Sequence, residues 1–337
     1  MFRYSLLAII VLITACNTGK NKPDVSHIKV DITIERFEKL FFSIDTNNIP
    51  AGLEKVVAQS GFYTDFMENI LQVPSDSGLN NTGLTIVRQF ISSYRPIYDS
   101  VEEKYRNMDW LKKDLTDAFK YVKYYYPQYK VPKVVTYIAP LDAPGTVLTA
   151  QYLGIGLHQY AGKNFSVYQS PDIQELYPVY ISRRFDKEYM VPNCMKAIVD
   201  DVYPDKSVGR PLIEQMIEKG KAWYLLDHFL PDAADTVKTG FTKKQLEWCR
   251  DNEGNIWGYV VKNENLYSIE PATIQNYIGE APFTQGMPEG SSPGNIGQWI
   301  GWQIVNKFAS EHKEMTTQQV LHMPARAIFE GAKYRPK

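Results

Sequence analysis

The stretch RPLIEQMIEKGKAWYLLDHFLPD, residues 210–232, carries the clearest helical pattern in the chain. Its apolar residues recur at steps of three and four, which is the period of an α-helix. Pro211 suits a first helical position, and Pro231 biases the residue before it out of the helical conformation. The second half of the stretch is apolar nearly all round. We therefore expect a helix that is buried on more than one side.

Gly220 lies in the middle of this predicted helix, where glycine costs about 1 kcal/mol relative to alanine. Such a cost is offset where another backbone approaches too closely for a side chain. A second small-residue stripe, Gly297 and Gly301, lies beside Trp299 and Trp302 in residues 291–312. These glycines fall within a predicted helix rather than on a strand-to-helix turn, so they indicate tight helix packing and not a phosphate loop.

Glu214 and Glu218 are four residues apart and share one face of the predicted helix. Like charges at this spacing repel each other by a few tenths of a kcal/mol. One interpretation is a solvated face, on which Lys219 and Lys221 offset the repulsion. The other is a carboxylate directed into a cleft, which would need partners from elsewhere in the chain.

The composition is that of a folded globular protein with almost no net charge. The chain has 337 residues, of which 37 are Lys or Arg and 38 are Asp or Glu. Removing residues 1–15 takes away only Arg3, which leaves 36 − 38 = −2. A nucleic-acid partner requires a basic face, and this balance argues against one.

The N-terminus is typical of a bacterial lipoprotein. Arg3 precedes an apolar run, residues 6–13, that is too short to cross a bilayer. The residues ITAC at 13–16 resemble a lipobox, which predicts a signal peptide over 1–15 and lipidation of Cys16. The alternative is a cleaved signal peptide followed by a chance cysteine. Two or more acyl chains anchor a protein stably, so residues 16–26 are expected to be a tether on a membrane.

The remaining sequence predicts an α+β fold, mostly α-helical with a small central β-sheet, forming a single domain over residues 27–337. Strands are expected at 28–34, 133–138, 146–149 and 152–157. Helices are expected at 50–60, 63–72, 84–93, 99–107, 111–126, 173–185, 192–202, 210–230, 243–264, 272–278 and within 291–312, where Ser292 caps the helix and Pro293 starts it. Cys194 and Cys249 either pair in an oxidising compartment or remain two buried thiols.

The sequence contains no recognisable catalytic motif. Its five histidines include no HxxxH pair, and there is neither a GxSxG elbow nor a Walker loop. No cofactor or metal is therefore expected, and catalysis is not favoured. The candidate cleft residues are Glu218, His158 and His228, the last of which follows Asp227 on the predicted helix.

Several long blocks resemble one family. They are ERFEKLFFSIDT (35–46), YPVYISRRFDKEYMVPNCMKAIVDDVYP (177–204), the stretch 210–232, FTKKQLEWCRDNEGNIWGYVVKNENLYS (241–268) and SPGNIGQWIGWQIV (292–305). Together with the lipobox they resemble the gliding-motility lipoprotein family GldB of Bacteroidota. The resemblance implies an envelope lipoprotein that supports gliding and its associated secretion machinery through protein partners. It assigns no reaction and no catalytic residue. Because no acidic run follows Cys16, we expect an outer-membrane anchor with the protein facing the periplasm.

A second, more distant resemblance concerns thermolysin-like metallopeptidases, the zincins. Their order of strand hairpin, helix and a second helix with E-x-G is matched by Glu218, Lys219 and Gly220. Residues 194–198 would occupy the place of HExxH, without its histidines and glutamate. Glu218 would then belong to a degenerate zincin-like scaffold. The alternative function is a zinc-dependent hydrolase-like or glycan-binding periplasmic lipoprotein that uses a cleft between Glu218 and the hairpin 146–158.

Overall fold

The structure is a computed structural model that describes residues 22–73 and 80–337. Cys16, the signal peptide and the first part of the tether lie outside the described residues. No helix in the described part of the chain is both long and apolar enough to cross a membrane.

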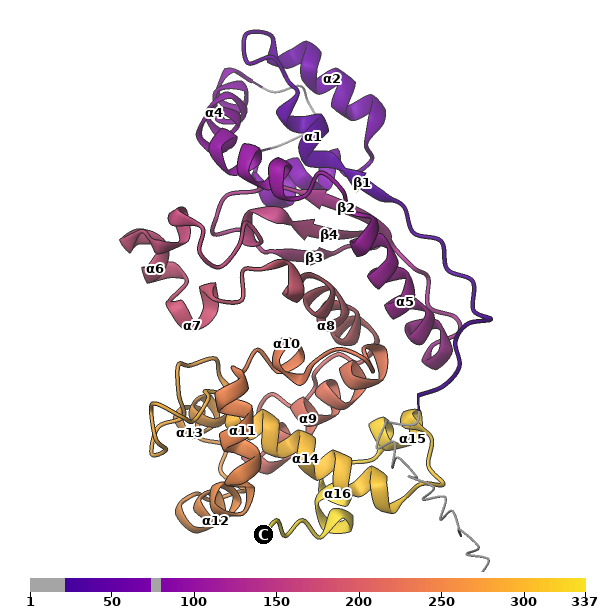
Figure 1. Cartoon of the computed structure of the whole chain (residues 1–337), viewed down its shortest axis with the longest axis vertical. Helices are drawn as coiled ribbons and strands as arrows, with labels where there is room; N and C mark the ends of the chain where they lie inside the picture. The colour runs from indigo at the N-terminus through magenta and orange to yellow at the C-terminus, as the bar shows by residue number, and fades with distance from the viewer. Residues whose placement is uncertain (1–21, 74–79) are drawn as a thin grey trace, which may run out of the picture.

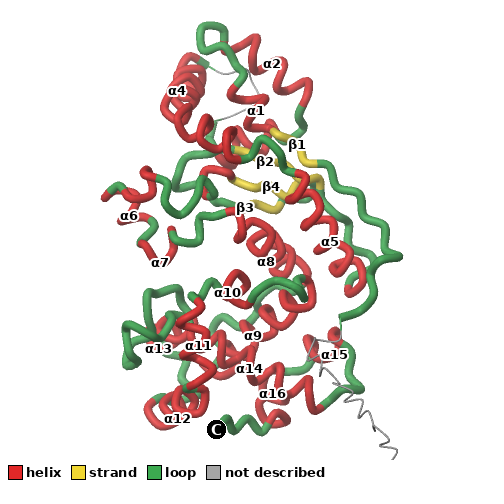
Figure 2. Tube along the Cα trace, in the orientation of Figure 1, coloured by secondary structure: helices red, strands yellow, loops and turns green. Residues whose placement is uncertain are grey.

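The chain forms two lobes, one above the other in Figure 1. We call residues 27–203 the sheet lobe and residues 210–337 the helical lobe. In chain order, the sheet lobe contains β1 Ile34–Arg36, α1 Phe37–Phe42, α2 Ile49–Gln59, α3 Tyr63–Asp65, a π-helical turn η1 Phe66–Ile70, α4 Asn81–Lys104, α5 Asp109–Tyr125, β2 Lys133–Tyr137, β3 Thr146–Leu148, β4 Tyr152–Gly156, the 3₁₀ turns η2 Leu157–Gln159 and η3 Ser166–Gln169, α6 Pro171–Leu176, α7 Val179–Ser182, the 3₁₀ turn η4 Lys187–Tyr189 and α8 Met190–Val202. The helical lobe contains α9 Leu212–Phe229, α10 Asp235–Thr239, α11 Lys243–Asp251, α12 Glu253–Asn263, α13 Pro271–Ile278, α14 Ile296–Glu311, α15 Thr317–His322 and α16 Ala325–Ala332. Figure 2 shows how far helix outweighs strand, which confirms the predicted α+β, mostly helical class.

The four strands form one mixed sheet in the order β1-β2-β4-β3. β1, β2 and β4 run parallel, and β3 pairs antiparallel with β4, with Val147 opposite Gly154. β4 is buried along its whole length and β2 at all but its first residue, which explains their nearly continuous apolar sequences. The three predicted strands 133–138, 146–149 and 152–157 are confirmed to within a residue at each end.

The predicted first strand, residues 28–34, is wrong, because β1 begins only at Ile34. The preceding segment is extended and buries Ile32 in the sheet-lobe core, where that side chain is 2% exposed. Alternating apolar residues report that one side of a segment is buried. They do not reveal whether a neighbouring strand supplies hydrogen bonds.

Helix α9 is shared by two separate hydrophobic cores. Leu212, Met216 and Ile217 pack in the core of the helical lobe. About two and a half to five turns later, Leu226 and Phe229 pack in the core of the sheet lobe. The nearly all-round apolar pattern of the sequence is explained by this change of partner along the helix.

The two predicted glycine contacts meet at one helix crossing. A Cβ atom built on Gly220 of α9 would lie 2.2 Å from the carbonyl carbon of Gly301 in α14. A Cβ atom on Gly301 would lie 1.7 Å from the carbonyl oxygen of Met216. The backbones of α9 and α14 therefore touch, which explains both glycine positions for which a close contact was expected, and Trp299 and Trp302 are both buried beside them.

Four predicted helix boundaries are wrong. α4 is continuous through Pro96, where two helices, 84–93 and 99–107, were expected. A proline inside a helix removes one backbone hydrogen bond, and in this long helix that loss does not end the helix. The helix expected at 173–185 is divided into α6 and α7 before Pro178. The helix expected at 243–264 is divided into α11 and α12 at Asn252.

The fourth wrong boundary concerns the start of α14. Asn295, with a left-handed φ of 47°, precedes the first helical residue, Ile296. Ser292 therefore does not cap this helix and Pro293 does not start it. Cys194 and Cys249 are free, buried thiols, and they lie in different cores.

Candidate functional site

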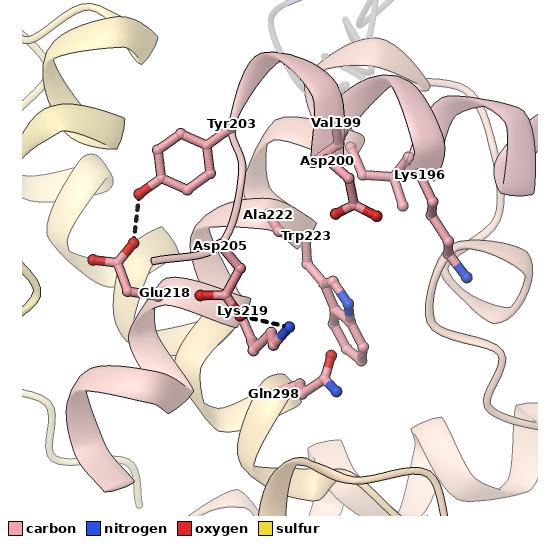
Figure 3. Close-up of a pocket in the computed structure, with 11 residues that line it drawn as sticks. Lys196, Val199, Asp200, Tyr203, Asp205, Glu218, Lys219, Ala222, Trp223 and Gln298 are labelled. Carbon is pink, nitrogen blue, oxygen red and sulfur yellow. Dashed lines mark hydrogen bonds and ion pairs between the residues drawn. The ribbon is translucent and has the colours of Figure 1, made fainter. Parts of the chain in front are cut away.

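A pocket lies where the two lobes meet, between α8 and α9 (Figure 3). Its volume is about 140 Å³. Ligand sites often form at the boundary between two cores, since neither core fills that space. The lining residues are Lys196, Val199, Asp200, Tyr203, Asp205, Glu218, Lys219, Ala222, Trp223, Leu226 and Gln298.

The helical period explains how α8 presents its share of this lining. Lys196, Val199, Asp200 and Tyr203 follow each other at steps of three, one and three, so they share one face. The opposite face of α8 is apolar and packs in the sheet-lobe core, where Cys194 and Ile198 are fully buried. Among residues 194–198, which the metallopeptidase resemblance singled out, only Lys196 lines the pocket.

One ion pair forms part of the pocket wall. The Lys219 ammonium lies 2.8 Å from the Asp205 carboxylate, as the dashed line in Figure 3 shows. Asp205 also accepts hydrogen bonds from the backbone N–H and the hydroxyl of Ser207, at 2.8 and 2.6 Å. Burial raises the pKa of Asp205, but these hydrogen bonds outweigh it and hold the pKa below its usual value.

Glu218 also lines the pocket, as the cleft interpretation requires, and its carboxylate is engaged in a hydrogen-bond network. Its Oε2 accepts from the Tyr203 hydroxyl at 2.5 Å, and its Oε1 accepts from the Lys221 ammonium at 2.7 Å. Lys221 has a side chain that is 2% exposed and also donates to the Met323 carbonyl at 2.6 Å. Burial lowers the pKa of Lys221, and the Glu218 carboxylate opposes that shift. The charges of Glu218 and Lys221 therefore stabilise each other.

Tyr203 and Glu218 separate this pocket from a larger, more open one of about 550 Å³. The second pocket is lined by the loop after α8, the start of α9 and the junction of α15 and α16. Glu214 lies there together with Lys206, Arg210 and Arg326. Both glutamates line this second pocket, and only Glu218 also lines the first.

Two charged residues of the first pocket make no direct hydrogen bond or ion pair within the described part of the chain. They are Lys196 and Asp200, one turn apart on α8. Burial lowers the pKa of Lys196 to about 8, with a further lowering by nearby Arg184, while Glu280 and Asp200 oppose the shift. Desolvation raises the pKa of Asp200. In Figure 3 the Lys196 side chain extends away from the Asp200 carboxylate.

The two candidate histidines lie elsewhere. His158 is fully buried in the sheet lobe, where its Nδ1 accepts from the Ala139 N–H at 3.3 Å and its Nε2 lies 3.2 Å from the Ala143 carbonyl. Burial lowers its pKa to about 4, so the ring is neutral. The Nδ1 atom of His228 lies 2.7 Å from the Tyr224 carbonyl oxygen, and the His228 ring packs edge-on against Tyr125.

The three residues named from the sequence are therefore not brought together. Glu218 lines both pockets, whereas neither His158 nor His228 lines either one. His228 follows Glu218 by ten residues on α9, which places it about 15 Å further along the axis. Among residues 22–73 and 80–337, no three His, Cys, Asp or Glu side chains are placed to hold one metal ion.

Sequence reasoning missed most of the residues around Glu218. Lys196 and Asp200 carry a usable signal, because charges four residues apart on an otherwise apolar helix must share one polar face. Trp223 belongs to the apolar helical pattern of residues 210–232, which predicts burial and not a pocket wall. Gln298 comes from α14 and has no local signal at all.

Comparison with known proteins supplies one match. No curated protein and no solved structure shows significant similarity to the chain. The family described as gliding motility protein GldB matches residues 18–336, nearly the whole chain. This protein therefore belongs to the GldB family of gliding motility lipoproteins.

Proposed function

We propose that the protein is a lipid-anchored component of the cell envelope that supports gliding motility, and its associated secretion machinery, by binding protein partners rather than by catalysis. Membership of the GldB family over residues 18–336 carries this proposal. The lipobox-like residues 13–16 supply the anchor, through the thiol of Cys16. We place the anchor in the outer membrane, with the folded part facing the periplasm.

The start of the described chain indicates a short tether. Lys22, the first described residue, pairs with Asp232 just beyond α9, with 2.6 Å between nitrogen and oxygen. Both side chains are exposed, so the pair contributes little to stability. Five residues lie between Cys16 and Lys22, so the two residues can be at most about 20 Å apart. The tether thus holds both lobes close to the membrane surface.

The network around Glu218 favours a structural role for that residue. Both carboxylate oxygens already accept hydrogen bonds, from Tyr203 and from Lys221. A metal ion at this carboxylate would compete with both donors and would lie beside the like charge of the Lys221 ammonium, so the network would have to rearrange. The hydrolase alternative would need that rearrangement.

Exposed apolar side chains provide positions at which partner binding can be tested. Val179 on α7 is 64% exposed, and Val208, in the loop between α8 and α9, is 86% exposed. Tyr267 and Ile269, which follow α12, are also largely exposed. Single exposed apolar residues are common, but groups of them mark interaction surfaces. These positions lie on both lobes.

Photo-crosslinking in living cells tests the proposal. A photoreactive amino acid is placed singly at Val179, Val208 or Ile269, and at exposed Lys243 on α11 as the control. We expect a crosslinked envelope protein from at least one apolar position and none from Lys243. A deletion strain that glides normally, together with no crosslink at any position, would refute the proposal.

A further inference from the structure

The pocket between α8 and α9 and the adjoining Lys221 together carry a balanced set of charges. Lys219 is paired with Asp205, and Lys221 with Glu218. These pairs leave one ammonium, Lys196, and one carboxylate, Asp200, without a direct partner among the described residues. Arg184 and Glu280, the other charges acting on Lys196, are paired with each other at 3.0 Å.

A ligand with a net charge would disturb this balance. An anion would pair with Lys196 but approach Asp200, and a cation would do the reverse. A molecule that carries both charges satisfies both groups at once. The charge pattern therefore selects a zwitterion, because like charges brought close together in a partly desolvated site are strongly unfavourable.

The spacing of the two groups fits a compact zwitterion. Side chains at i and i+4 on a helix have their Cβ atoms about 5–6 Å apart. Figure 3 shows the Lys196 ammonium turned away from the Asp200 carboxylate, so the long flexible Lys196 stem has to turn toward Asp200 for the two charged ends to bracket one small group. In an α-amino acid the ammonium and the carboxylate are attached to the same carbon. That arrangement places both charges within reach of one turn of α8.

The rest of the lining suits the remainder of such a ligand. Trp223 projects from α9 into the same space, and Figure 3 shows its indole beside the Gln298 amide. The volume of about 140 Å³ is enough for a small molecule rather than a single water. Aromatic walls with a few fixed polar groups are typical of small-molecule sites.

We propose that this pocket binds a zwitterion of the α-amino-acid class, whose carboxylate pairs with Lys196, whose ammonium pairs with Asp200 and whose side chain contacts Trp223. Two sources share this chemistry. One is a free amino acid, and the other is the free end of a diaminopimelate residue in a cell-wall peptide. The inference is independent of the protein partners proposed above.

Calorimetric titration of the purified protein tests the site. The probes are the free amino acids, a muramyl tripeptide ending in diaminopimelate, and glucose as a neutral molecule of similar size. We expect binding of the first or the second probe, which identifies the source, and no binding of glucose. Binding of glucose alone, or of none of the probes at millimolar concentration, overturns the proposal.

Variants then assign each charge. Lys196→Met and Asp200→Asn keep side-chain size and should each weaken binding at least about tenfold, the usual effect of losing a charged hydrogen bond. Lys243→Met, the same change at an exposed lysine, should leave affinity unaltered. N-acetylation of the ligand removes its ammonium and should weaken binding to the wild type but not further to Asp200→Asn. Methyl esterification of the ligand removes the charge of its carboxylate and should weaken binding to the wild type but not further to Lys196→Met.

These comparisons separate binding from folding. Lys196→Met should melt at or above the wild-type temperature, because it removes an unpaired charge from a half-buried position, and Asp200→Asn should melt near the wild-type temperature, because Asp200 is exposed. Circular dichroism shows whether a variant with reduced affinity is still folded. The modified ligands test the same charge pairs in the wild type, whose folding is unchanged. Equal affinity of the wild type for the zwitterion, its N-acetyl form and its methyl ester refutes the assigned pairing.

Discussion

Replacing Gly301 with alanine should push α9 and α14 apart. The new methyl carbon would lie 1.7 Å from the Met216 carbonyl oxygen and 2.4 Å from the Met216 carbonyl carbon. Carbon–oxygen contacts settle at roughly twice the shorter distance, so the helices must separate by more than about 1 Å. Neither obstacle can rotate away, because both atoms belong to the backbone of α9.

The cost follows from how much of the helical-lobe core depends on this crossing. Ile217, Ile300 and Trp302 pack within the same core. A gap of about 0.5–1 Å removes a quarter to a half of each affected contact energy. Overpacking of this kind typically costs about 1–3 kcal/mol, and a backbone obstacle puts it at the upper end. Alanine recovers up to about 1 kcal/mol through its better helix propensity. We expect a net loss of about 2 kcal/mol.

Gly258→Ala is the matched control, because it makes the same change within helix α12, where a Cβ atom meets nothing within 4 Å. It should stabilise the protein by about 0.5–1 kcal/mol. Chemical denaturation of the purified protein measures both free energies of unfolding. Equal stability changes for the two variants would refute the close backbone contact.

Further variants test the anchor, the pocket lysine and the glutamate. Cys16→Ser should no longer incorporate a fatty-acid probe and should retain its signal peptide; undiminished labelling would contradict lipidation. Lys196, with its pKa near 8, is about half unprotonated at pH 8, whereas an ordinary lysine is less than about 1% so. An amine reagent at pH 8 should therefore modify Lys196 faster than exposed Lys243, and equal rates by peptide mass spectrometry would argue against the lowered pKa. Glu218→Gln should cost about 1–3 kcal/mol, because Lys221 loses its counter-charge. Elemental analysis should find no stoichiometric zinc in the wild type, and one zinc per chain that is lost in Glu218→Gln would favour the hydrolase alternative.

The sequence predicted the structure well where buried residues recur at regular steps along one segment. Residues 210–232 predicted α9 and, through Gly220, a backbone contact that α14 provides. Prediction failed where the outcome depends on a neighbour distant in sequence. Ile32 alternates with polar residues as strand residues do, but the segment around it lacks a paired strand before Ile34. Two separate helices were expected at 84–93 and 99–107, but α4 is continuous through Pro96.

The candidate site was only partly predictable for the same reason. Glu218 was recognised because two glutamates share one helix face. Its hydrogen-bond donor Tyr203 comes from the end of α8, and Gln298 joins the pocket from α14. The sequence contains no pattern that links these three elements. His158 and His228 were named only because histidines are chemically versatile, and both bind backbone carbonyls instead.

The sharing of α9 between two cores also determines how the protein comes apart. Unfolding the helical lobe would remove the first turns of α9 and expose the apolar surface that its last turns cover in the sheet lobe. Because α9 packs in both cores, the loss of one core destabilises the other. The lobes look separate in outline, yet they should melt as one cooperative unit. A pull on the lipid anchor, transmitted through the N-terminal segment to β1, would accordingly load the whole molecule and not one lobe alone.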